Sequence, residues 1–434
     1  MNRLLYNIFL HTVVAPVLAI YYLPKVALGR KYRRSLSGKL GRLPADFVPE
    51  KFPRPRIWFH AVSVGEVVAL GPLVAAVKQL NPTAAVIVST GTETGQDKAV
   101  ETIPEADGLL YLPLDFPYFL DPVVQRIRPD LFVLMETELW PNLIDSLRRN
   151  GSKVALANGR ISDRSFPRYK RLSRLFSPVL DQVDLFLMSS EVDGRRIAEM
   201  GAPGERIHIT GNTKFDAALA EIPRDAEARV RELFNLAADA KVLVAGSTHP
   251  GEHEIVLDAY CSLLEKFPDL LLIVVPRHVE RAPSIISAMK ERNMNPPFLR
   301  SSLDQGMRRR QEQVIIVDRM GELFVVFSVA SVVFMGGSLV PKGGQNILEP
   351  AAWGKVVLFG PSMEDFRDAR DILGRAGAGI EISSASDLVR KVTEMLLEPE
   401  KADLLGIKGS EEILRHVGSA KKNAEMLTRL IERK

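Results

Sequence analysis

From residue 56 onward, short apolar runs alternate with longer stretches in which apolar residues recur at helical spacing. The runs lack the polar alternation of strands that face water on one side, and this is typical of strands buried on both faces of a parallel sheet. In the first half of the chain they lie at 56–61, 84–89, 131–136, 153–158 and 184–189. In the second half they lie at 242–247, 270–276, 314–317, 331–337 and 355–359. The pattern therefore predicts an α/β protein with two successive doubly wound parallel sheets.

A charged stretch at 218–235 separates the two series, and it contains a proline and no strand-like run. We interpret it as the connector that leads into a second domain. The expected domains are 46–217 and 218–434, and the last helix of the second is free to pack back on the first. Ligands of doubly wound sheets bind beyond the carboxyl ends of the strands. We therefore expect the ligand site in a cleft between the two domains.

Residues 1–45 form a segment with a different pattern. The run at 4–24 approaches the ~20 apolar residues that a membrane-spanning helix needs, although Asn7, His11 and Pro16 interrupt it. Residues 1–45 hold eight basic side chains and no acidic one, and most of them follow the apolar run. The positive-inside rule then keeps the rest of the chain cytoplasmic, and the basic cluster attracts anionic lipids. We predict a membrane anchor helix, either spanning or interfacial; a helix packed against the body is the alternative.

Composition narrows the class of protein. Hydrophobic residues make up 46% and charged residues 25%, which are ordinary values for a globular protein. The formal net charge is +4, and because the uncompensated basic residues lie in the first segment, the remaining chain is net negative. This disfavours a body that binds nucleic acid. The single cysteine, Cys261, excludes a disulfide framework and a cysteine-built zinc site, and it favours a reducing compartment.

Acidic residues follow two strands of the first series. In HAVSVGE, Ser63 and Glu66 have the spacing of a capping box at the start of a helix. The same helix N-terminus favours the ionised carboxylate that a general base requires, so both interpretations stay open. In METELWPN, Glu136 and Glu138 follow a buried strand, where two carboxylates are costly unless one is paired or faces a ligand. Capping of the next helix by Thr137, with Glu138 in its first turn, is the alternative.

In the second series, AGSTHPGEHE contains His249, Glu252 and His253 in the order of an inverted zinc-protease motif. Pro250 suits the first position of a helix and leaves His249 outside it. The two histidines then do not share one helical face, and we expect no metal. We interpret this segment as a strand, a loop and a helix whose loop amides can face an anion.

Two more segments carry chemistry at strand ends. VVPRH ends a strand with a cation, Arg277, and a hydrogen-bond donor, His278. The segment at 334–354, FMGGSLVPKGGQNILEPAAWG, has glycines that allow close backbone approach to a ligand, with Asn346 as a candidate N-cap and Glu349 behind it. It matches neither the Walker pattern nor GxGxxG. A tight turn before a capped helix is the alternative.

Nine motifs occur in one order between residue 60 and about residue 352. They are HAVSVGE, STGTETG, METELWPN, NGRISDRS, GNTKFD, AGSTHPGE, PRHVER, MGEL and GGSLVPKGGQNILEPAA. Together they resemble the 3-deoxy-D-manno-oct-2-ulosonic acid (Kdo) transferases of lipopolysaccharide assembly, and the apolar and basic N-terminus is similar too. The resemblance implies a GT-B fold, in which two Rossmann-like domains face a cleft, the N-terminal one for the acceptor and the C-terminal one for CMP-Kdo.

The resemblance also implies the reaction. Kdo passes from CMP-Kdo, a co-substrate, to the lipid A precursor lipid IVA with inversion, without metal or cofactor, at the cytoplasmic side of the bacterial inner membrane. Glu66 would be the general base, and Glu136 and Lys214 would support the transition state. The residues expected to hold CMP are Arg277, His278, Gly321, Glu322, Leu323, Ile347, Leu348, Glu349 and Pro350.

Two positions depart from the family pattern. Gln345 replaces the histidine usual in GGHN, and Arg319 replaces the small polar residue usual before MGEL. Because glutamine does not titrate, the first change argues against a proton-donating role at position 345. Two other classes remain as alternatives. A GT-B enzyme that uses a UDP-sugar and a lipid acceptor would respond to UDP rather than CMP. A non-catalytic membrane-bound lipid-binding protein would release no CMP.

Overall fold

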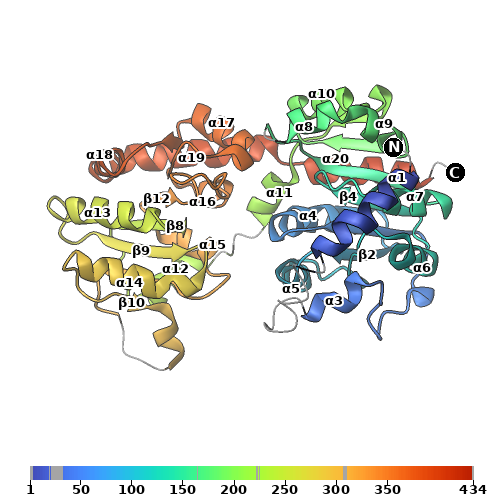
Figure 1. Cartoon of the computed structure of the whole chain (residues 1–434). Helices are drawn as coiled ribbons and strands as arrows, with labels where there is room; N and C mark the ends of the chain where they lie inside the picture. The colour runs from blue at the N-terminus through green and yellow to red at the C-terminus, as the bar shows by residue number, and fades with distance from the viewer. Residues whose placement is uncertain are drawn as a thin grey trace. The chain divides into compact units, whose positions relative to one another are not determined.

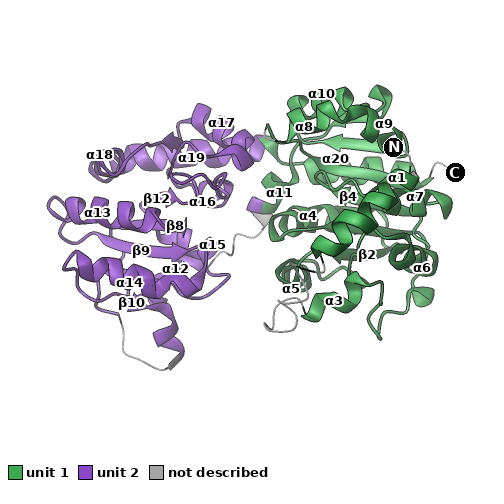
Figure 2. Cartoon of the chain, in the orientation of Figure 1, with its two compact units in different colours: residues 1–217, 416–434 green, residues 218–415 purple. Residues whose placement is uncertain are grey.

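The computed structural model describes residues 3–18, 20, 33–163, 165–220, 223, 225–305 and 310–432. The chain forms two compact units (Figures 1 and 2). Unit 1 comprises residues 1–217 and 416–434, and unit 2 comprises residues 218–415. The predicted second domain, 218–434, therefore extends past this division, because the last helix belongs to unit 1.

Unit 1 contains a seven-stranded parallel sheet in the order β3-β2-β1-β4-β5-β6-β7. Its strands are β1 (Arg56–Ala61), β2 (Ala85–Thr90), β3 (Gly108–Tyr111), β4 (Leu131–Met135), β5 (Lys153–Gly159), β6 (Leu185–Met188) and β7 (Ile207–Ile209). The strand order changes direction between β1 and β4, which makes the carboxyl end of this pair the switch point of the sheet. Side chains on both faces are buried: Trp58 lies in one core cluster, and Ile57 and Phe59 lie in the other.

The helices of unit 1 cover both faces of this sheet. They are α1 (Arg3–Phe9), the π-helical η1 (Leu10–Val14), α3 (Arg33–Lys39), α4 (Val64–Leu80), α5 (Glu93–Thr102), α6 (Pro117–Ile127), α7 (Pro141–Arg149), α8 (Phe166–Arg171), α9 (Ser173–Leu180), α10 (Glu191–Glu199), α11 (Thr213–Ala220) and α20 (Ser419–Glu432). Short 3-10 turns lie at η2 (Pro49–Lys51) and η3 (Gly204–Arg206). Side-chain caps fix several helix starts: Ser63 accepts from Glu66 N, Thr92 from Gly95 N, and Ser190 from Asp193 N.

Unit 2 repeats the plan with a sheet in the order β10-β11-β9-β8-β12-β13-β14. Its strands are β8 (Val242–Thr248), β9 (Leu271–Pro276), β10 (Phe298–Leu299), β11 (Val314–Ile316), β12 (Val332–Met335), β13 (Val357–Phe359) and β14 (Gly379–Glu381). Here the order changes direction between β8 and β12. The prediction of two doubly wound parallel sheets is therefore confirmed.

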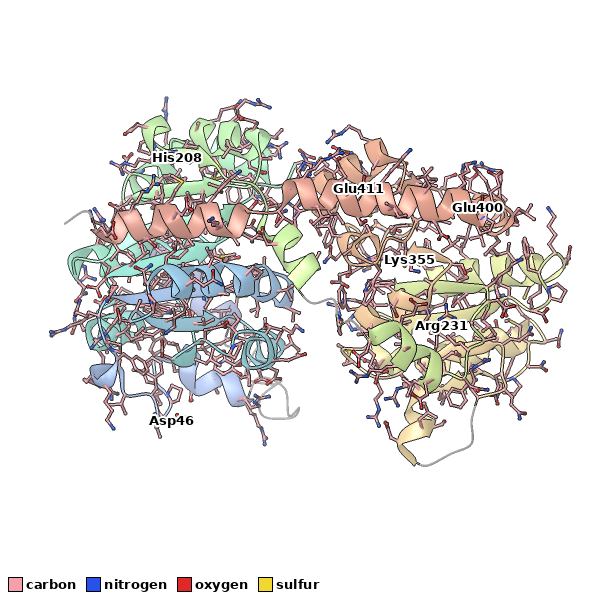
Figure 3. The ribbon with its side chains drawn as sticks, turned by 180° about the vertical axis from the view of Figure 1, so that it is seen from behind. Asp46, His208, Arg231, Lys355, Glu400 and Glu411 are labelled. Carbon is pink, nitrogen blue, oxygen red and sulfur yellow. The ribbon has the colours of Figure 1, made fainter. Side chains whose placement is uncertain are left out.

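The helices of unit 2 are α12 (Ala226–Leu233), α13 (Glu252–Leu264), α14 (Ala282–Glu291), α15 (Leu323–Val326), α16 (Leu348–Ala352), α17 (Arg367–Ala376), α18 (Ala385–Leu397) and α19 (Pro399–His416), with 3-10 turns η4 (Val279–Arg281), η5 (Arg300–Gln305), η6 (Phe327–Val329) and η7 (Glu364–Phe366). The exposed face of α19 carries charges such as Glu400 and Glu411 (Figure 3). Its opposite face packs closely: a Cβ on Gly406 would lie 1.8 Å from the Gly354 carbonyl oxygen.

After α19 the chain returns to unit 1. Helix α20 packs against α4: Ala424 and Leu427 belong to the same core cluster as Leu73 and Val77, and Asn81 Nδ2 donates to Thr428 Oγ1 at 2.7 Å. This packing places a helix from the end of the chain over the helix that begins at Val64.

The N-terminal helix is docked on unit 1. Tyr6 Oη donates to Asp115 Oδ2 at 2.7 Å, and Asn142 Nδ2 donates to Asn7 Oδ1 at 2.7 Å. Leu10 is buried, and the His11 ring lies edge-on to Phe116. No helix of the described residues is long and apolar enough to cross a membrane. The predicted anchor run at 4–24 lies only partly within the described residues.

Candidate active site

The carboxyl ends of β1 and β4 bring two predicted site residues to one edge of the unit 1 sheet. Glu66 lies in the first turn of α4, which follows β1, and Glu136 comes directly after β4. The two strands are neighbours at the switch point, where α/β sheets of this kind bind ligands. The sheet topology therefore accounts for their proximity.

The Glu66 carboxylate is held by local hydrogen bonds. Val62 N donates to Oε2 at 2.9 Å, Ser63 Oγ donates to Oε1 at 2.9 Å, and Glu66 N donates to Ser63 Oγ at 3.4 Å. The capping box thus forms. Burial, and next the charge of Glu136, raise the pKa of Glu66 to about 7, against the lowering effect of the Val62 and Ser63 donors. A fixed carboxylate with a pKa near neutrality is suited to general-base chemistry, so the two interpretations are compatible.

Glu136 adopts a left-handed backbone conformation, with φ of 56°. Such strain in a residue other than glycine is concentrated at functional sites. Its Oε1 accepts from Lys214 Nζ at 2.8 Å. Burial raises the pKa of Glu136, but the charges of Lys214 and Arg160 outweigh burial, so the pKa lies below its ordinary value. Glu136 is therefore an ionised carboxylate paired with a lysine.

Asn158, at the end of β5, explains how Lys214 reaches Glu136. The Asn158 side chain is buried, its backbone φ is 53°, and its Oδ1 accepts from Thr213 N at 3.0 Å. This bond fixes the first turn of α11, which carries Lys214. We did not predict a role for Asn158; the available signal was a polar residue before glycine at the end of an apolar run.

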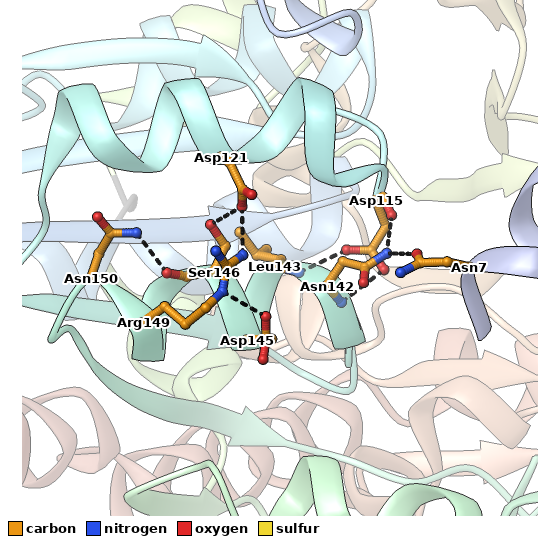
Figure 4. Close-up of polar contacts among 9 residues, drawn as sticks. All are labelled: Asn7, Asp115, Asp121, Asn142, Leu143, Asp145, Ser146, Arg149 and Asn150. Carbon is orange, nitrogen blue, oxygen red and sulfur yellow. Dashed lines mark hydrogen bonds and ion pairs between the residues drawn. The ribbon is translucent and has the colours of Figure 1, made fainter. Parts of the chain in front are cut away.

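Thr137 does not cap α7, contrary to the alternative drawn from the sequence. Its hydroxyl donates to the carbonyl of Arg160. The cap comes from Asp115, whose Oδ1 accepts from Leu143 N at 2.9 Å and whose Oδ2 accepts from Asn142 N at 3.2 Å (Figure 4). Tyr6 donates to the same carboxylate. Asp115 precedes α6, so its contribution to α7 is not visible in the local sequence.

Glu138 lies between Glu136 and the start of α7. Burial, and next the charge of Glu136, raise the pKa of Glu138. Glu66 and Glu138 therefore share one neighbour, the ionised Glu136, that opposes their own ionisation.

In unit 2, the ends of β8 and β9 carry the predicted basic residues. Arg277 N donates to the Thr248 carbonyl at 3.0 Å, and the rings of His249 and His278 lie 6.2 Å apart. Helix α13 begins at Glu252 after the N-cap Gly251, so His249 lies outside it, as predicted. Pro250 also precedes the helix and does not occupy its first position, contrary to the prediction. Burial lowers the pKa of His249, and Glu252 opposes this shift while His278 and Arg277 add to it. Across the described ranges, no group of three or more acidic, histidine or cysteine side chains could hold a metal ion.

The remaining residues expected to hold CMP lie in two segments of unit 2, where a loop leads into the short helix α15 or α16. Asn346 Oδ1 accepts from Leu348 N at 3.2 Å, and Asn346 Nδ2 donates to Glu349 Oε1 at 3.0 Å. Ile347, Leu348 and Pro350 are buried, so they would offer a ligand backbone groups rather than side chains.

In the other loop, Gly321 has φ of 86°, and Glu322 Oε2 accepts from Arg300 Nε at 2.9 Å. Leu323 begins α15. Arg319 and Gln345 are the two positions that depart from the family pattern. Arg319 donates to Asp304 Oδ2 at 2.7 Å. Gln345 lies against Gly337, where a Cβ would be 3.2 Å from Gln345 Cγ.

The two parallel sheets define the class of protein: α/β proteins with two Rossmann-like units, as in GT-B glycosyltransferases. The crystal structure of UDP-GlcNAc 2-epimerase from Neisseria meningitidis has this fold, with a TM-score of 0.61 and 13% identity over 87% of this chain and 100% of that one. At that identity the likeness shows the fold alone.

Sequence comparison identifies the family. Residues 34–217 match the family model described as 3-deoxy-D-manno-octulosonic-acid transferase (kdotransferase). The 3-deoxy-D-manno-octulosonic acid transferase of Haemophilus influenzae is 34% identical over 93% of both chains. The enzyme of that name from Chlamydophila psittaci is 31% identical over 87% of this chain and 86% of its own. The chain belongs to the Kdo transferase family and is a glycosyltransferase, as the nine motifs indicate.

Proposed function

We propose that the chain transfers Kdo from CMP-Kdo to lipid IVA with inversion at the anomeric carbon. Glu66 takes the proton of the acceptor hydroxyl while the hydroxyl oxygen bonds to the anomeric carbon. The bond from that carbon to the phosphate oxygen breaks, and its electron pair leaves with CMP. The observation that carries this proposal is the Glu66 carboxylate, fixed at the switch point of unit 1 with a pKa raised to about 7.

The neighbours of Glu66 support this role. The ionised Glu136 raises the proton affinity of Glu66, and Lys214 holds Glu136 in its ionised form. Lys214 also supplies a fixed positive charge that stabilises negative charge developing in the transition state. Glu136 and Lys214 therefore act as one electrostatic unit beside the base.

The donor side of the proposal lies on unit 2. Arg277 offers the fork of donors that matches a phosphate group, and Glu349 can accept from ribose hydroxyls. The leaving CMP needs charge stabilisation rather than a nucleophile. Because Arg277 and Lys214 supply positive charge through side chains, we propose a reaction without metal or cofactor.

The test is to incubate the protein with lipid IVA and CMP-Kdo and to analyse the product by mass spectrometry. We expect Kdo to be added, with inhibition by CMP and not by UDP. Arg277→Ala should weaken CMP binding in calorimetry at least about tenfold, as expected for loss of a charge-assisted contact. Inhibition by UDP alone would indicate a different glycosyltransferase. Absence of CMP release would indicate a lipid-binding protein, and strict dependence on a divalent ion would contradict the metal-free reaction.

We also propose that the N-terminal helix attaches the enzyme to the cytoplasmic face of the inner membrane. The polar residues Tyr6, Asn7 and His11 face unit 1. The opposite face of the helix exposes Leu4, Leu5, Ile8, Phe9, Val13 and Val17. We call these six residues the apolar stripe. A helix that lies along a protein and exposes an apolar stripe is typical of interfacial attachment. The acceptor, a lipid, would reach unit 1 from the same surface.

A further inference from the structure

Glu252 is a buried carboxylate whose partners are all backbone amides. The side chain is 0% exposed. Its Oε2 accepts from His249 N at 2.9 Å and from Gly337 N at 2.7 Å. Its Oε1 accepts from Ser338 N at 3.0 Å and from Leu339 N at 2.9 Å. No ion pair involves Glu252 within the described part of the chain. Because a buried charge is costly unless its lone pairs are satisfied, these bonds determine where both loops lie.

The switch point of the unit 2 sheet brings these loops together. Strands β8 and β12 are neighbours, and their chain ends continue side by side, with Gly336 N donating to the Gly246 carbonyl at 2.8 Å. A Cβ on Gly336 would lie 2.5 Å from the Ser247 carbonyl oxygen, so only glycine permits this approach. Glu252, in the first turn of α13, then bridges the loop after β8 and the loop after β12.

The residues whose amides bind Glu252 also make hydrogen bonds that hold the rest of the glycine-rich loop, residues 336–346, in place. Gly337 O accepts from Gly344 N at 2.8 Å, which closes the loop two residues before Asn346. Ser338 Oγ accepts from Gly360 N at 2.8 Å and ties the loop to the end of β13. The position of Gly337 and Ser338 therefore sets the position of the segment 346–350.

We propose that Glu252 is the positioning residue of the donor site: it holds His249 and the loop 337–339 in place, and it does not touch the donor. This inference rests on the proposed function, because the loops matter as the expected CMP site. In this arrangement the protein's own carboxylate occupies the group of amides that would otherwise bind an anion. The donor then meets the outer side of a loop that is already rigid.

A structural role and a positioning role make different predictions. Loss of general stability would lower the amount of active enzyme and leave the KM of both substrates unchanged. Loss of positioning would raise the KM of CMP-Kdo and the Kd of CMP. Of the two substrates, only the donor is proposed to contact these loops. The KM of lipid IVA and the affinity of unit 1 for its ligands would not change.

Glu252→Gln is the direct test, since glutamine keeps the shape but has one acceptor oxygen and places an NH2 group against the other amides. The matched control is Glu254→Gln. Glu254 lies in the same turn, is exposed, and accepts from Gly251 N at 3.1 Å. We expect Glu252→Gln to weaken CMP binding in calorimetry at least about tenfold. Hydrogen exchange at 337–339 should be faster, and Glu254→Gln should resemble wild type in both measurements.

The outcomes separate this inference from the function on which it rests. If wild type binds CMP and Glu252→Gln binds it equally well, the positioning role is wrong and the proposed function stands. If wild type does not bind CMP, the proposed function fails, and the role assigned to Glu252 fails with it. Should Glu252→Gln not fold, Glu252→Asp is the second variant, because it keeps the charge and shortens the side chain by one methylene. Its CMP affinity and its hydrogen exchange at 337–339 would be compared with those of wild type and Glu254→Gln.

Discussion

At the residue scale, Glu66 combines a cap and a candidate base in one carboxylate. Glutamine also serves in a capping box, and loss of a cap costs only ~1 kcal/mol of stability. We therefore expect Glu66→Gln to melt within a few degrees of wild type and to bind CMP normally. Loss of a general base should lower Kdo transfer by at least about a hundredfold. Near-normal turnover in the folded variant would leave Glu66 with a structural role and make Glu136 the next candidate.

The pKa of Glu66 predicts opposite pH trends for activity and stability. A base must be ionised, so kcat/KM should rise as pH increases through about 7 and then level off. The folded state binds this proton more tightly than the unfolded state, whose glutamate has a pKa near 4.5. The contribution of Glu66 to stability is therefore present below pH 4.5 and is lost as pH rises to about 7.

Rate and melting profiles of wild type and Glu66→Gln, recorded from pH 4 to 9, would measure both trends. The variant should lose the rising limb of the rate and show a flatter dependence of stability on pH. A rising limb that persists unchanged in the residual activity of Glu66→Gln would assign the titration to another group.

Some residues of the candidate site could be predicted from the sequence, and others could not. Glu66 and Glu136 belong to short motifs at strand ends, where a parallel sheet gathers functional groups. Asn158, Asp115 and Glu252 act through backbone amides that lie far away in the chain. No local spacing reports such contacts, so Asn158 and Asp115 were given no role, and Glu252 was interpreted only through a zinc motif.

At the element scale, the length of the apolar run decided which strands could be predicted. The central strands, such as β1 and β4, have buried side chains throughout and lie close to their predicted bounds. The edge strands β3, β7, β10 and β14 are short and carry partly exposed residues. Their side chains give neither a continuous apolar run nor a clean alternation, so the pattern missed them.

The N-terminal helix shows how one run can support two predictions. Asn7 and His11 interrupt its apolar character, and they were interpreted as weaknesses of an anchor. In the structure these same positions, with Tyr6, contact unit 1. Downstream, Arg34 pairs with Asp97, and Ser35 N donates to Glu93 Oε1 at 3.1 Å. A deletion of residues 1–45 would therefore remove contacts of the fold together with any anchor.

Tyr6→Phe tests this docking while keeping the ring. The change removes the donor to Asp115, a buried carboxylate whose pKa is raised to about 6, chiefly by burial. Asp115 keeps its hydrogen bonds from Asn142 N and Leu143 N, so losing the bond from Tyr6 should cost ~1 kcal/mol. We expect faster hydrogen exchange in residues 3–18. Tyr118→Phe, at an exposed tyrosine of the same unit, is the control and should leave exchange unchanged. Equal exchange in Tyr6→Phe and wild type would show that this bond does not hold the helix.

At the scale of the whole molecule, the apolar stripe predicts how the protein would contact a membrane that carries the proposed lipid acceptor. Leu5→Glu places a charge in the stripe without touching the docked face. It should lower binding to vesicles that contain anionic lipid about tenfold or more, since an apolar contact is lost and a repulsive charge is added. Val100→Glu is the matched control, because Val100 on α5 is 65% exposed and Leu5 is 63% exposed. Sedimentation with vesicles measures both. Equal binding of Leu5→Glu and wild type would contradict membrane attachment through this helix.

The return of the chain to unit 1 affects the order in which the protein is made. The ribosome completes all of unit 2 before it synthesises α20, the helix that covers α4. Until then Leu73 and Val77 on α4 lack their packing partners Ala424 and Leu427, so the helix that carries Glu66 is not fully packed. A nascent chain interrupted after residue 415 would therefore have a complete unit 2. The helix that carries Glu66, the candidate base, would lack part of its packing. Chain termination shortly before α20 should yield a product that is recognised by proteases and is unable to transfer sugar.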